Sequence, residues 1–330
     1  MQLDRRSMGR AALGLAAGAL LPAPALAAYT TPFGPGAPWN VPVAGLALHS
    51  QSNTYRDRLW NGGSDRPGNI NLTFEGYTYP VYDARQAAGL YPVRITSSGN
   101  LSGKTIPWNS SWRAASGSDG QVIVLDPPTG REWNLWQVGF SGGKVTATNG
   151  NLVPGSYWTK VDGFAPSRGC GIQYQAMLVR PDEVAGGVIR HALSMPIRCV
   201  DRALYLPPAT KTDGSRFGVA SGVPEGMRFC LRVSDSQIEA WIAGLPATLG
   251  SASRQSARVI ARALRDYGWF VTDHAGSAHL QSEDRLTAAA GWTALGLGRI
   301  TAGGKKYPRD LLDGLLQRDR IHAIVPSNQY

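Results

Sequence analysis

Hydrophobic and polar residues alternate with a period of two over much of this chain, which is typical of half-buried β-strands. The clearest case is the apolar run 121–126, followed by the segment 127–130 and the alternating run 131–138. Within the last run, Trp133 falls on one face and Trp136 on the other. Proline and glycine in the segment 127–130 predict a tight turn, so we expect a β-hairpin here.

Similar runs predict the other strands, and only one long stretch has the period of a helix. We expect strands over residues 77–82, 91–96, 188–197, 227–233, 269–272, 278–282 and 321–325, with a hairpin across 273–276. An apolar stripe predicts a long helix over 253–267, and shorter helices are expected over 54–59, 181–185, 236–244 and 309–317. Short, evenly spaced strands with few helices predict a mainly β fold, a two-sheet, jelly-roll-like β-sandwich.

The N-terminal residues have the pattern of an export leader. Arg5 and Arg6 precede the apolar run 11–21, and a small-residue cleavage pattern ends at Ala27. A membrane span needs about 20 apolar residues, so the run predicts a cleaved leader and no stable membrane anchor. Paired arginines favour a twin-arginine signal peptide over 1–27 and export of the folded protein to the periplasm or beyond. We then expect an extended lead-in over 28–75 and a single β-sandwich domain over 76–330.

The charge of the chain bears on its partners. It has 33 Lys and Arg against 23 Asp and Glu, a net charge of +10, but these residues are scattered. No basic run predicts a nucleic-acid-binding arm. In an exported protein this charge favours an acidic polysaccharide or an anionic envelope, although solubility alone is an alternative explanation. The partners expected are a polysaccharide and the twin-arginine export machinery, with no nucleic acid, and the protein is expected to be a monomer.

Three cysteines lie beyond the leader, at positions 170, 199 and 230. Their spacing does not match a metal-binding pair. Cys199 and Cys230 both fall in strand-like runs, so we expect them to form a disulfide and Cys170 to remain a buried thiol. No phosphate-binding loop and no GxGxxG motif occur, and we expect neither a cofactor nor a metal.

One segment contains the residue types that β-elimination of a uronate requires. Such a reaction needs a group that neutralises the carboxylate, a base for the C5 proton and a donor for the leaving oxygen. We assign His191, Tyr174 and Arg190 as catalytic, and we expect Gln173, Arg180, Trp133 and Trp136 to bind substrate. Because alternation places His191 with apolar neighbours, a role in the core stays open. The leading hypothesis is a polysaccharide lyase.

Two other functions stay open. A glycoside hydrolase needs two carboxylates across a cleft, for which Asp126 and Glu132, or the pair 182–183, are candidates. The third hypothesis is a non-catalytic protein that binds glycans or the envelope. His274, His279 and Asp273 also have the residue types of a two-histidine, one-carboxylate metal site, but a polar turn is favoured there.

Three segments carry a resemblance to known proteins: 119–137, 178–193 and 261–273, which read DGQVIVLDPPTGREWNLWQ, LVRPDEVAGGVIRHAL and ARALRDYGWFVTD. They resemble a family of secreted bacterial β-sandwich, jelly-roll-like proteins. The resemblance implies the fold and secretion, and it implies no particular reaction.

Overall fold

The architecture was derived from a computed structural model, which describes residues 33–153, 168–297 and 311–327. Strands make up 29% and helices 24%, so the fold is mixed α/β and not mainly β. One sheet curls into a half-barrel and the other sheets are small, so the expected two-sheet sandwich is not present. All described residues belong to one compact unit, Thr31–Tyr330.

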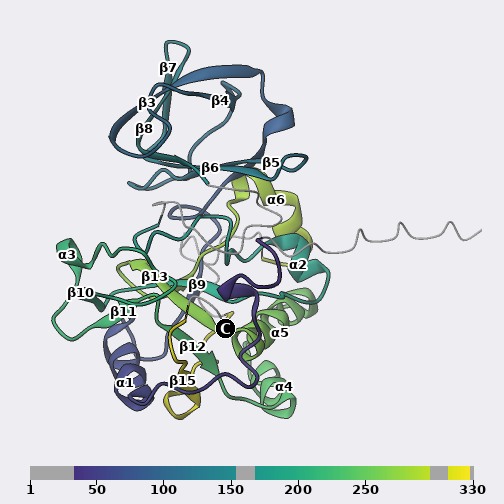
Figure 1. Ribbon diagram of the computed structural model, residues 1–330. Helices are drawn as coiled ribbons and strands as arrows, with labels where there is room; N and C mark the ends of the chain where they lie inside the picture. Colours follow the sequence, from purple (N-terminus) through teal and green to yellow (C-terminus); the bar gives the residue numbers. More distant parts are fainter. Residues whose placement is uncertain (1–32, 154–167, 298–310, 328–330) are drawn as a thin grey trace, which may run out of the picture. The chain divides into compact units, whose positions relative to one another are not determined.

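The curled sheet is drawn in the upper part of Figure 1. Its strand order is β2 (Val81–Asp83), β5 (Val122–Asp126), β6 (Arg131–Trp136), β8 (Lys144–Leu152), β3 (Gly89–Ser98) and β4 (Thr105–Trp108), with β7 (Gly139–Ser141) paired to β8. The β2–β5 and β3–β8 pairs are parallel, and the other pairs are antiparallel. The concave face is filled by apolar side chains that include Trp108, Trp112 and Trp133. Burial of large aromatic rings is a main source of stability in such a core.

The predicted hairpin is confirmed. Strands β5 and β6 pair with Asp126 opposite Arg131, and the Gly130 amide donates to the Asp126 carbonyl at 2.8 Å. Gly130 has a φ of 64°, which glycine adopts readily. Trp133 and Leu135 point into the core, and Glu132 and Trp136 point to the opposite face. The alternation of the sequence therefore assigns both faces of β6 correctly.

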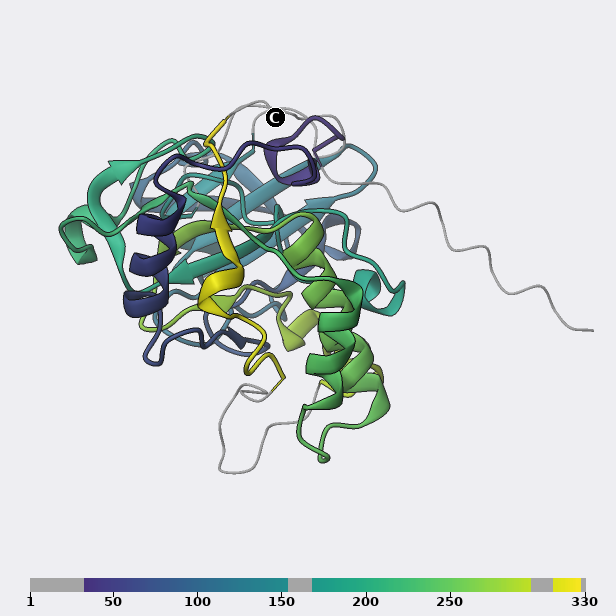
Figure 2. The same ribbon diagram turned by 90° about the horizontal axis from the view of Figure 1, so that it is seen from below.

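A second sheet has four strands in the order β15 (Ile321–Ala323), β12 (Arg228–Leu231), β13 (Trp269–His274) and β9 (Leu193–Ile197). Helix α1 (Ser52–Gly62) and the pair α4 (Asp235–Ala243) and α5 (Ser251–Asp266) lie on either side of β15 in Figure 2. The predicted long helix is confirmed as α5, whose buried stripe includes Val259, Ile260 and Leu264. Gly268 follows it with a φ of 71°, and a Cβ there would lie 2.0 Å from the Phe229 carbonyl oxygen. Only glycine allows the chain to pass so close to β12 on its way into β13.

Smaller elements complete the fold. Two parallel two-stranded sheets are β1 (Asn71–Leu72) with β14 (His279–Leu280), and β10 (Val200–Tyr205) with β11 (Val223–Glu225). The remaining helices are α2 (Pro181–Ala185), α3 (Gly214–Phe217) and α6 (Arg285–Ala294), and the 3-10 turns are Pro38–Asn40, Ala84–Gln86 and Arg318–Arg320.

Several sequence predictions are corrected. Strands β13 and β14 do not form a hairpin: β13 pairs with β9 and β12, while β14 pairs with β1. The Ala275 amide donates to Ile197 and the Ala278 carbonyl accepts from Asn71, so the intervening segment crosses from one sheet to the other. Residues 311–317 form turns and not a helix, and 309–310 lie outside the described residues. Helix α6 was not predicted, because its apolar residues follow no clear stripe.

The expected Cys199–Cys230 disulfide is absent, because all three cysteines are free and buried. Cys199 packs in the core around the second sheet, where its Sγ lies 3.5 Å from the Arg58 carbonyl oxygen. Cys230 lies on β12 between Phe229 and Leu231, which both point into that core. Because side chains alternate along a strand, Cys230 faces the opposite side and cannot meet Cys199.

The leader proposed for residues 1–27 lies outside the described residues. Among the helices that the structure does describe, none combines the length and the apolar character that crossing a bilayer requires.

Candidate functional site

A cavity of about 890 Å³ lies beside the curled sheet and is the candidate site. Its walls come from five stretches of chain and from Pro196 on β9. The stretches are 65–79, 118–149, 168–174, 211–217 and 273–281. The convex face of β6 and β8 contributes Trp136 and Asn149, and the end of β13 contributes Asp273. The volume is typical of pockets that bind a small ligand or a segment of a polymer. We call it the central pocket.

The lining of the central pocket combines flat aromatic rings with many short polar groups. Its aromatic side chains are Tyr77, Tyr79, Trp136, Tyr174 and Phe217, and its amides are Asn71, Gln121, Gln137, Asn149 and Gln281. Aromatic faces pack against the apolar faces of sugar rings, and amides and carboxylates bind their hydroxyl groups. The composition of the wall therefore suits a saccharide.

Arg168 organises one wall of the central pocket. Its side chain is buried and donates hydrogen bonds to Gln281 Oε1 at 3.0 Å and to the carbonyl oxygens of Gln173 and Tyr174 at 2.5 and 2.6 Å. Its guanidinium also lies over the Tyr79 ring, 5.3 Å from the centroid. These contacts hold the 173–174 segment against Tyr79 and fix the two tyrosines next to each other, with ring centroids 4.6 Å apart.

The pKa values of two carboxyl groups in the central pocket are shifted in opposite directions. Burial raises the pKa of Asp119, although Trp136 and the hydrogen bond from Gln121 partly oppose it. The hydrogen bond from Ser277 Oγ to Asp65, 3.0 Å long, is the main reason why the pKa of Asp65 is lowered. A pair of carboxyl groups whose pKa values are pushed apart is the arrangement that acid–base catalysis uses. These shifts favour the protonated form of Asp119 and the ionised form of Asp65.

Three further acidic residues lie together at the central pocket, two of them in its lining. Oxygen atoms of Asp213, Glu225 and Asp273 all lie within 4.8 Å of one another. Burial, followed by the charges of Asp273 and Asp213, raises the pKa of Glu225 to about 10. Burial and the charge of Asp213 also raise the pKa of Asp273 well above its usual range. We call these three residues the acidic cluster.

His191, the predicted base, is buried away from the central pocket. Its Nε2 lies 3.1 Å from a Glu183 carboxylate oxygen and its Nδ1 lies 2.8 Å from the Ala192 carbonyl oxygen. Arg180 Nε donates to the same carboxylate at 3.0 Å. Burial alone would raise the pKa of Glu183, but the charges and hydrogen bonds of His191 and Arg180 hold it down at about 2. His191 and Arg180 therefore form a buried ion network at α2.

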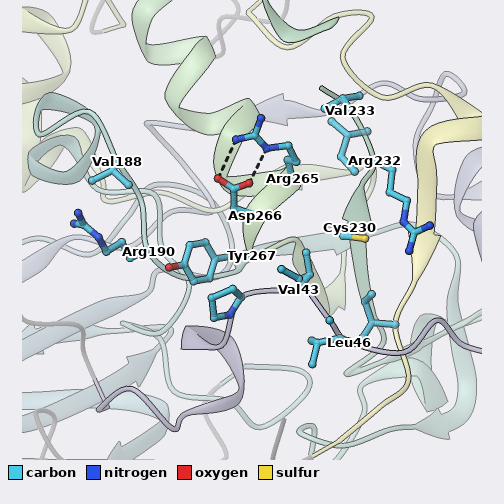
Figure 3. Close-up of a pocket in the computed structure, with 15 residues that line it drawn as sticks. Val43, Leu46, Val188, Arg190, Cys230, Arg232, Val233, Arg265, Asp266 and Tyr267 are labelled. Carbon is cyan, nitrogen blue, oxygen red and sulfur yellow. Dashed lines mark hydrogen bonds and ion pairs between the residues drawn. The ribbon is translucent and has the colours of Figure 1, made fainter. Parts of the chain in front are cut away.

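The other predicted residues are divided between several places. Tyr174 and Trp136 line the central pocket. Trp133 is in the core of the curled sheet, and Gln173 is fully buried and lines neither pocket. Arg190 lines a different pocket of about 640 Å³, which Figure 3 shows. There it lies near Tyr267, while the neighbouring Arg265 is paired with Asp266 at 2.6 Å. The structure thus does not bring the set proposed for elimination together.

The carboxylate pair proposed for hydrolysis is also separated from the central pocket. Asp126 accepts a hydrogen bond from Thr129 within the hairpin turn. Glu132 is fully buried and accepts from Asn134 Nδ2 at 2.6 Å and from the Gln175 amide at 2.9 Å. At α2, Asp182 is largely exposed and Glu183 belongs to the ion network.

Glu132 makes the stability of the fold depend on pH. Burial raises its pKa from 4.5 to about 7, against the hydrogen bonds that favour its charged form. The contribution of Glu132 to the free energy of unfolding is therefore fully present below pH 4.5. It is lost as the pH rises through 7, which lowers the free energy of unfolding by roughly 3 kcal/mol. We expect Glu132→Gln to flatten the fall in the free energy of unfolding across that interval, as measured by urea denaturation. Asp126→Asn is the control, and an unchanged slope in the Glu132 variant would contradict the assignment.

The sequence did not single out Asp65, Asp119, Asp213 or Arg168 as site residues. Asp119 and Gly120 come just before the apolar run 121–126 that predicts a strand. Polar side chains in this position often lie at the end of a sheet. A GxSxG match also occurs at 139–143, but it lies on the β7–β8 hairpin. A nucleophile elbow needs a strand-to-helix turn, so this match does not mark one.

Comparison of the chain with protein-family models, with curated proteins and with solved structures gives no match.

Proposed function

We propose that this chain is an exported carbohydrate-active enzyme that hydrolyses an acidic polysaccharide in the central pocket. Asp119 is the proton donor to the leaving glycosidic oxygen, and Asp65 is the base that activates water or the nucleophile that attacks the sugar. The observation that carries the proposal is that one saccharide-sized pocket contains two carboxylates whose pKa values are shifted in opposite directions.

The charge of the pocket supports an acidic substrate. Lys211 and Arg216 line it, and among the described residues neither forms an ion pair with a carboxylate. Together with the net charge of +10, they favour a polymer that carries carboxylates or sulfates. Trp136 provides a face for one sugar ring.

Elimination is the second candidate, and one observation favours it. The phenol groups of Tyr79 and Tyr174 line the same pocket as Lys211. A phenol can donate to the leaving oxygen, and a cation can neutralise the uronate carboxylate. His191 has no part in this version, because it is bound to Glu183 outside the pocket.

A panel of polysaccharides separates the reactions. The protein beginning at Ala28 is incubated with alginate, glucuronan, pectate and a neutral glucan, and reducing ends and ultraviolet absorbance are followed together. Hydrolysis of an acidic polymer gives reducing ends without new absorbance, which is the expected result. New absorbance would establish elimination instead. Retention on an immobilised polymer with neither signal would show a binding protein and overturn the catalytic proposal.

A further inference from the structure

We infer that the acidic cluster, formed by Asp213, Glu225 and Asp273, is a binding site for a divalent cation, with Ca²⁺ the best match. The inference goes beyond the proposed hydrolysis and does not depend on it, since neither Asp119 nor Asp65 belongs to the cluster. It also differs from the expectation drawn from the sequence, which was that no metal would bind.

The three carboxylates reach one point from three separate segments. Glu225 is the last residue of β11, Asp273 lies near the end of β13, and Asp213 directly precedes α3. Their oxygen atoms lie within 4.8 Å of one another. Ca²⁺ binds oxygen at 2.3–2.6 Å, so ligands on opposite sides of one ion are roughly 4.6–5.2 Å apart. The cluster therefore has the dimensions of a calcium coordination shell.

Glu225 gives an independent reason to expect a ligand. Its side chain is fully buried, and neither carboxylate oxygen has a hydrogen bond of normal geometry. The Thr212 and Asp213 side chains lie close enough to affect its pKa. Asp213 Oδ1 is likewise buried without a partner. A buried carboxylate without partners is costly, and native proteins seldom leave one so. A cation between the three residues would satisfy these oxygens together.

The backbone at Gly169 passes close to the carboxylates of the acidic cluster. A Cβ atom there would lie 2.6 Å from Asp273 Oδ1 and 2.9 Å from Glu225 Oε1. The Gly169 amide instead donates to Asp273 Oδ2 at 3.2 Å, and the His274 amide donates to Oδ1 at 3.1 Å. These two bonds orient the Asp273 carboxylate, as outer hydrogen bonds orient ligands in metal sites.

No protein cation neutralises the cluster within the ranges that the structure describes. None of the ion pairs there involves Asp213, Glu225 or Asp273. An all-carboxylate oxygen set suits Ca²⁺, Mg²⁺ and Mn²⁺ and is a poor match for Zn²⁺. His274 and His279 are not part of the group, so the two-histidine alternative has no support.

The ion would be accessible from the central pocket. Asp213 and Asp273 line the pocket directly, and Glu225 closes the cluster behind them. A cation at this depth keeps coordination positions open toward the pocket, where sugar hydroxyl or carboxylate oxygens can complete its shell. A role of the ion in recognising an anionic glycan rests on the proposed function, whereas the cation site itself does not.

Cation binding can be measured without any glycan. The folded protein is freed of metal with a chelator and titrated with Ca²⁺ by calorimetry and with Tb³⁺ by luminescence, which Trp136 and the tyrosines of the pocket can sensitise. We expect one ion per chain, with a dissociation constant on the order of 10⁻⁴–10⁻³ M, as in extracellular calcium modules. Glu225→Gln and Asp273→Asn should weaken binding by at least about 10–100-fold, the loss that changes in the outer shell of a metal site already cause. Asp126→Asn, far from the cluster in the hairpin turn, should bind as the parent does.

Two results would overturn the site. One is the absence of binding of Ca²⁺, Mg²⁺ or Mn²⁺ to the folded protein up to millimolar concentrations. The other is binding that persists unchanged in both variants, which would place the ion elsewhere. If Glu225→Gln fails to fold, Asp213→Asn, in a partly exposed loop, serves instead. Because no substrate is present, failure here leaves the hydrolysis by Asp119 and Asp65 open, and failure of the polysaccharide panel leaves the cation site open.

Discussion

Asp119→Asn is expected to lower the turnover of an acidic polysaccharide by about 10²–10⁴-fold, the usual contribution of a positioned general acid. Asparagine keeps the shape and the hydrogen bond from Gln121, but it cannot give a proton to the leaving oxygen. The rate is measured as reducing ends released per folded protein, at several pH values. Asp65→Asn should cause a loss of similar size by removing the base.

The pH profile provides a second test of the same pair. The acid must be protonated and the base ionised, so kcat/KM should be bell-shaped. The raised pKa of Asp119 places the alkaline limb above the usual range of an aspartate, and the lowered pKa of Asp65 places the acid limb below it. Asp126→Asn, which removes a carboxylate outside the pocket, should leave both limbs in place. Turnover of Asp119→Asn within a factor of two of the parent would remove Asp119 from the mechanism.

Local pattern predicts the local structure of this chain well. The β5–β6 hairpin follows from alternation on both sides of a proline–glycine turn, and α5 follows from an apolar stripe. Both are contacts between residues close in sequence. The parallel pairings of β9 with β13 and of β3 with β8 join distant segments, and alternation contains no information on which strands will pair. The curled sheet could therefore not be distinguished from a sandwich by periodicity.

The site was harder to predict than the elements, for the same reason. Tyr174 and Trp136 were chosen for their chemistry, and both line the central pocket. His191 was chosen because a histidine can act as a base near neutral pH, but its role depends on Glu183, which the first turn of α2 places against it. Asp119 and Asp273 are far apart in the sequence and meet in one pocket only after the sheets have formed. A pocket built from six separate segments has no linear motif.

Breaking the buried ion network at α2 should have the largest effect on stability. Glu183 is buried between His191 and Arg180, so Glu183→Ala leaves the Arg180 guanidinium and the His191 ring without their shared partner. Removing one member of a buried ion pair costs about 3–5 kcal/mol, and we expect the free energy of unfolding to fall by that amount at pH 7. Guanidinium denaturation measures it. Asp182→Asn, at the neighbouring exposed position, should change stability by less than about 0.5 kcal/mol.

The contribution of the ion network to stability also depends on pH. This dependence distinguishes loss of the network from a loss of packing, which does not titrate. The pKa of Glu183 is about 2 in the folded protein, below the ordinary 4.5, so its contribution is present above pH 4.5 and is lost as the pH falls through 2. The difference in the free energy of unfolding between the parent and Glu183→Gln should therefore shrink toward acid pH.

His191→Ala should lower the melting temperature while the turnover of the folded fraction is unchanged, because His191 does not line the central pocket. A His191 variant that melts like the parent but has lost its turnover would return this residue to the active site and refute the structural role.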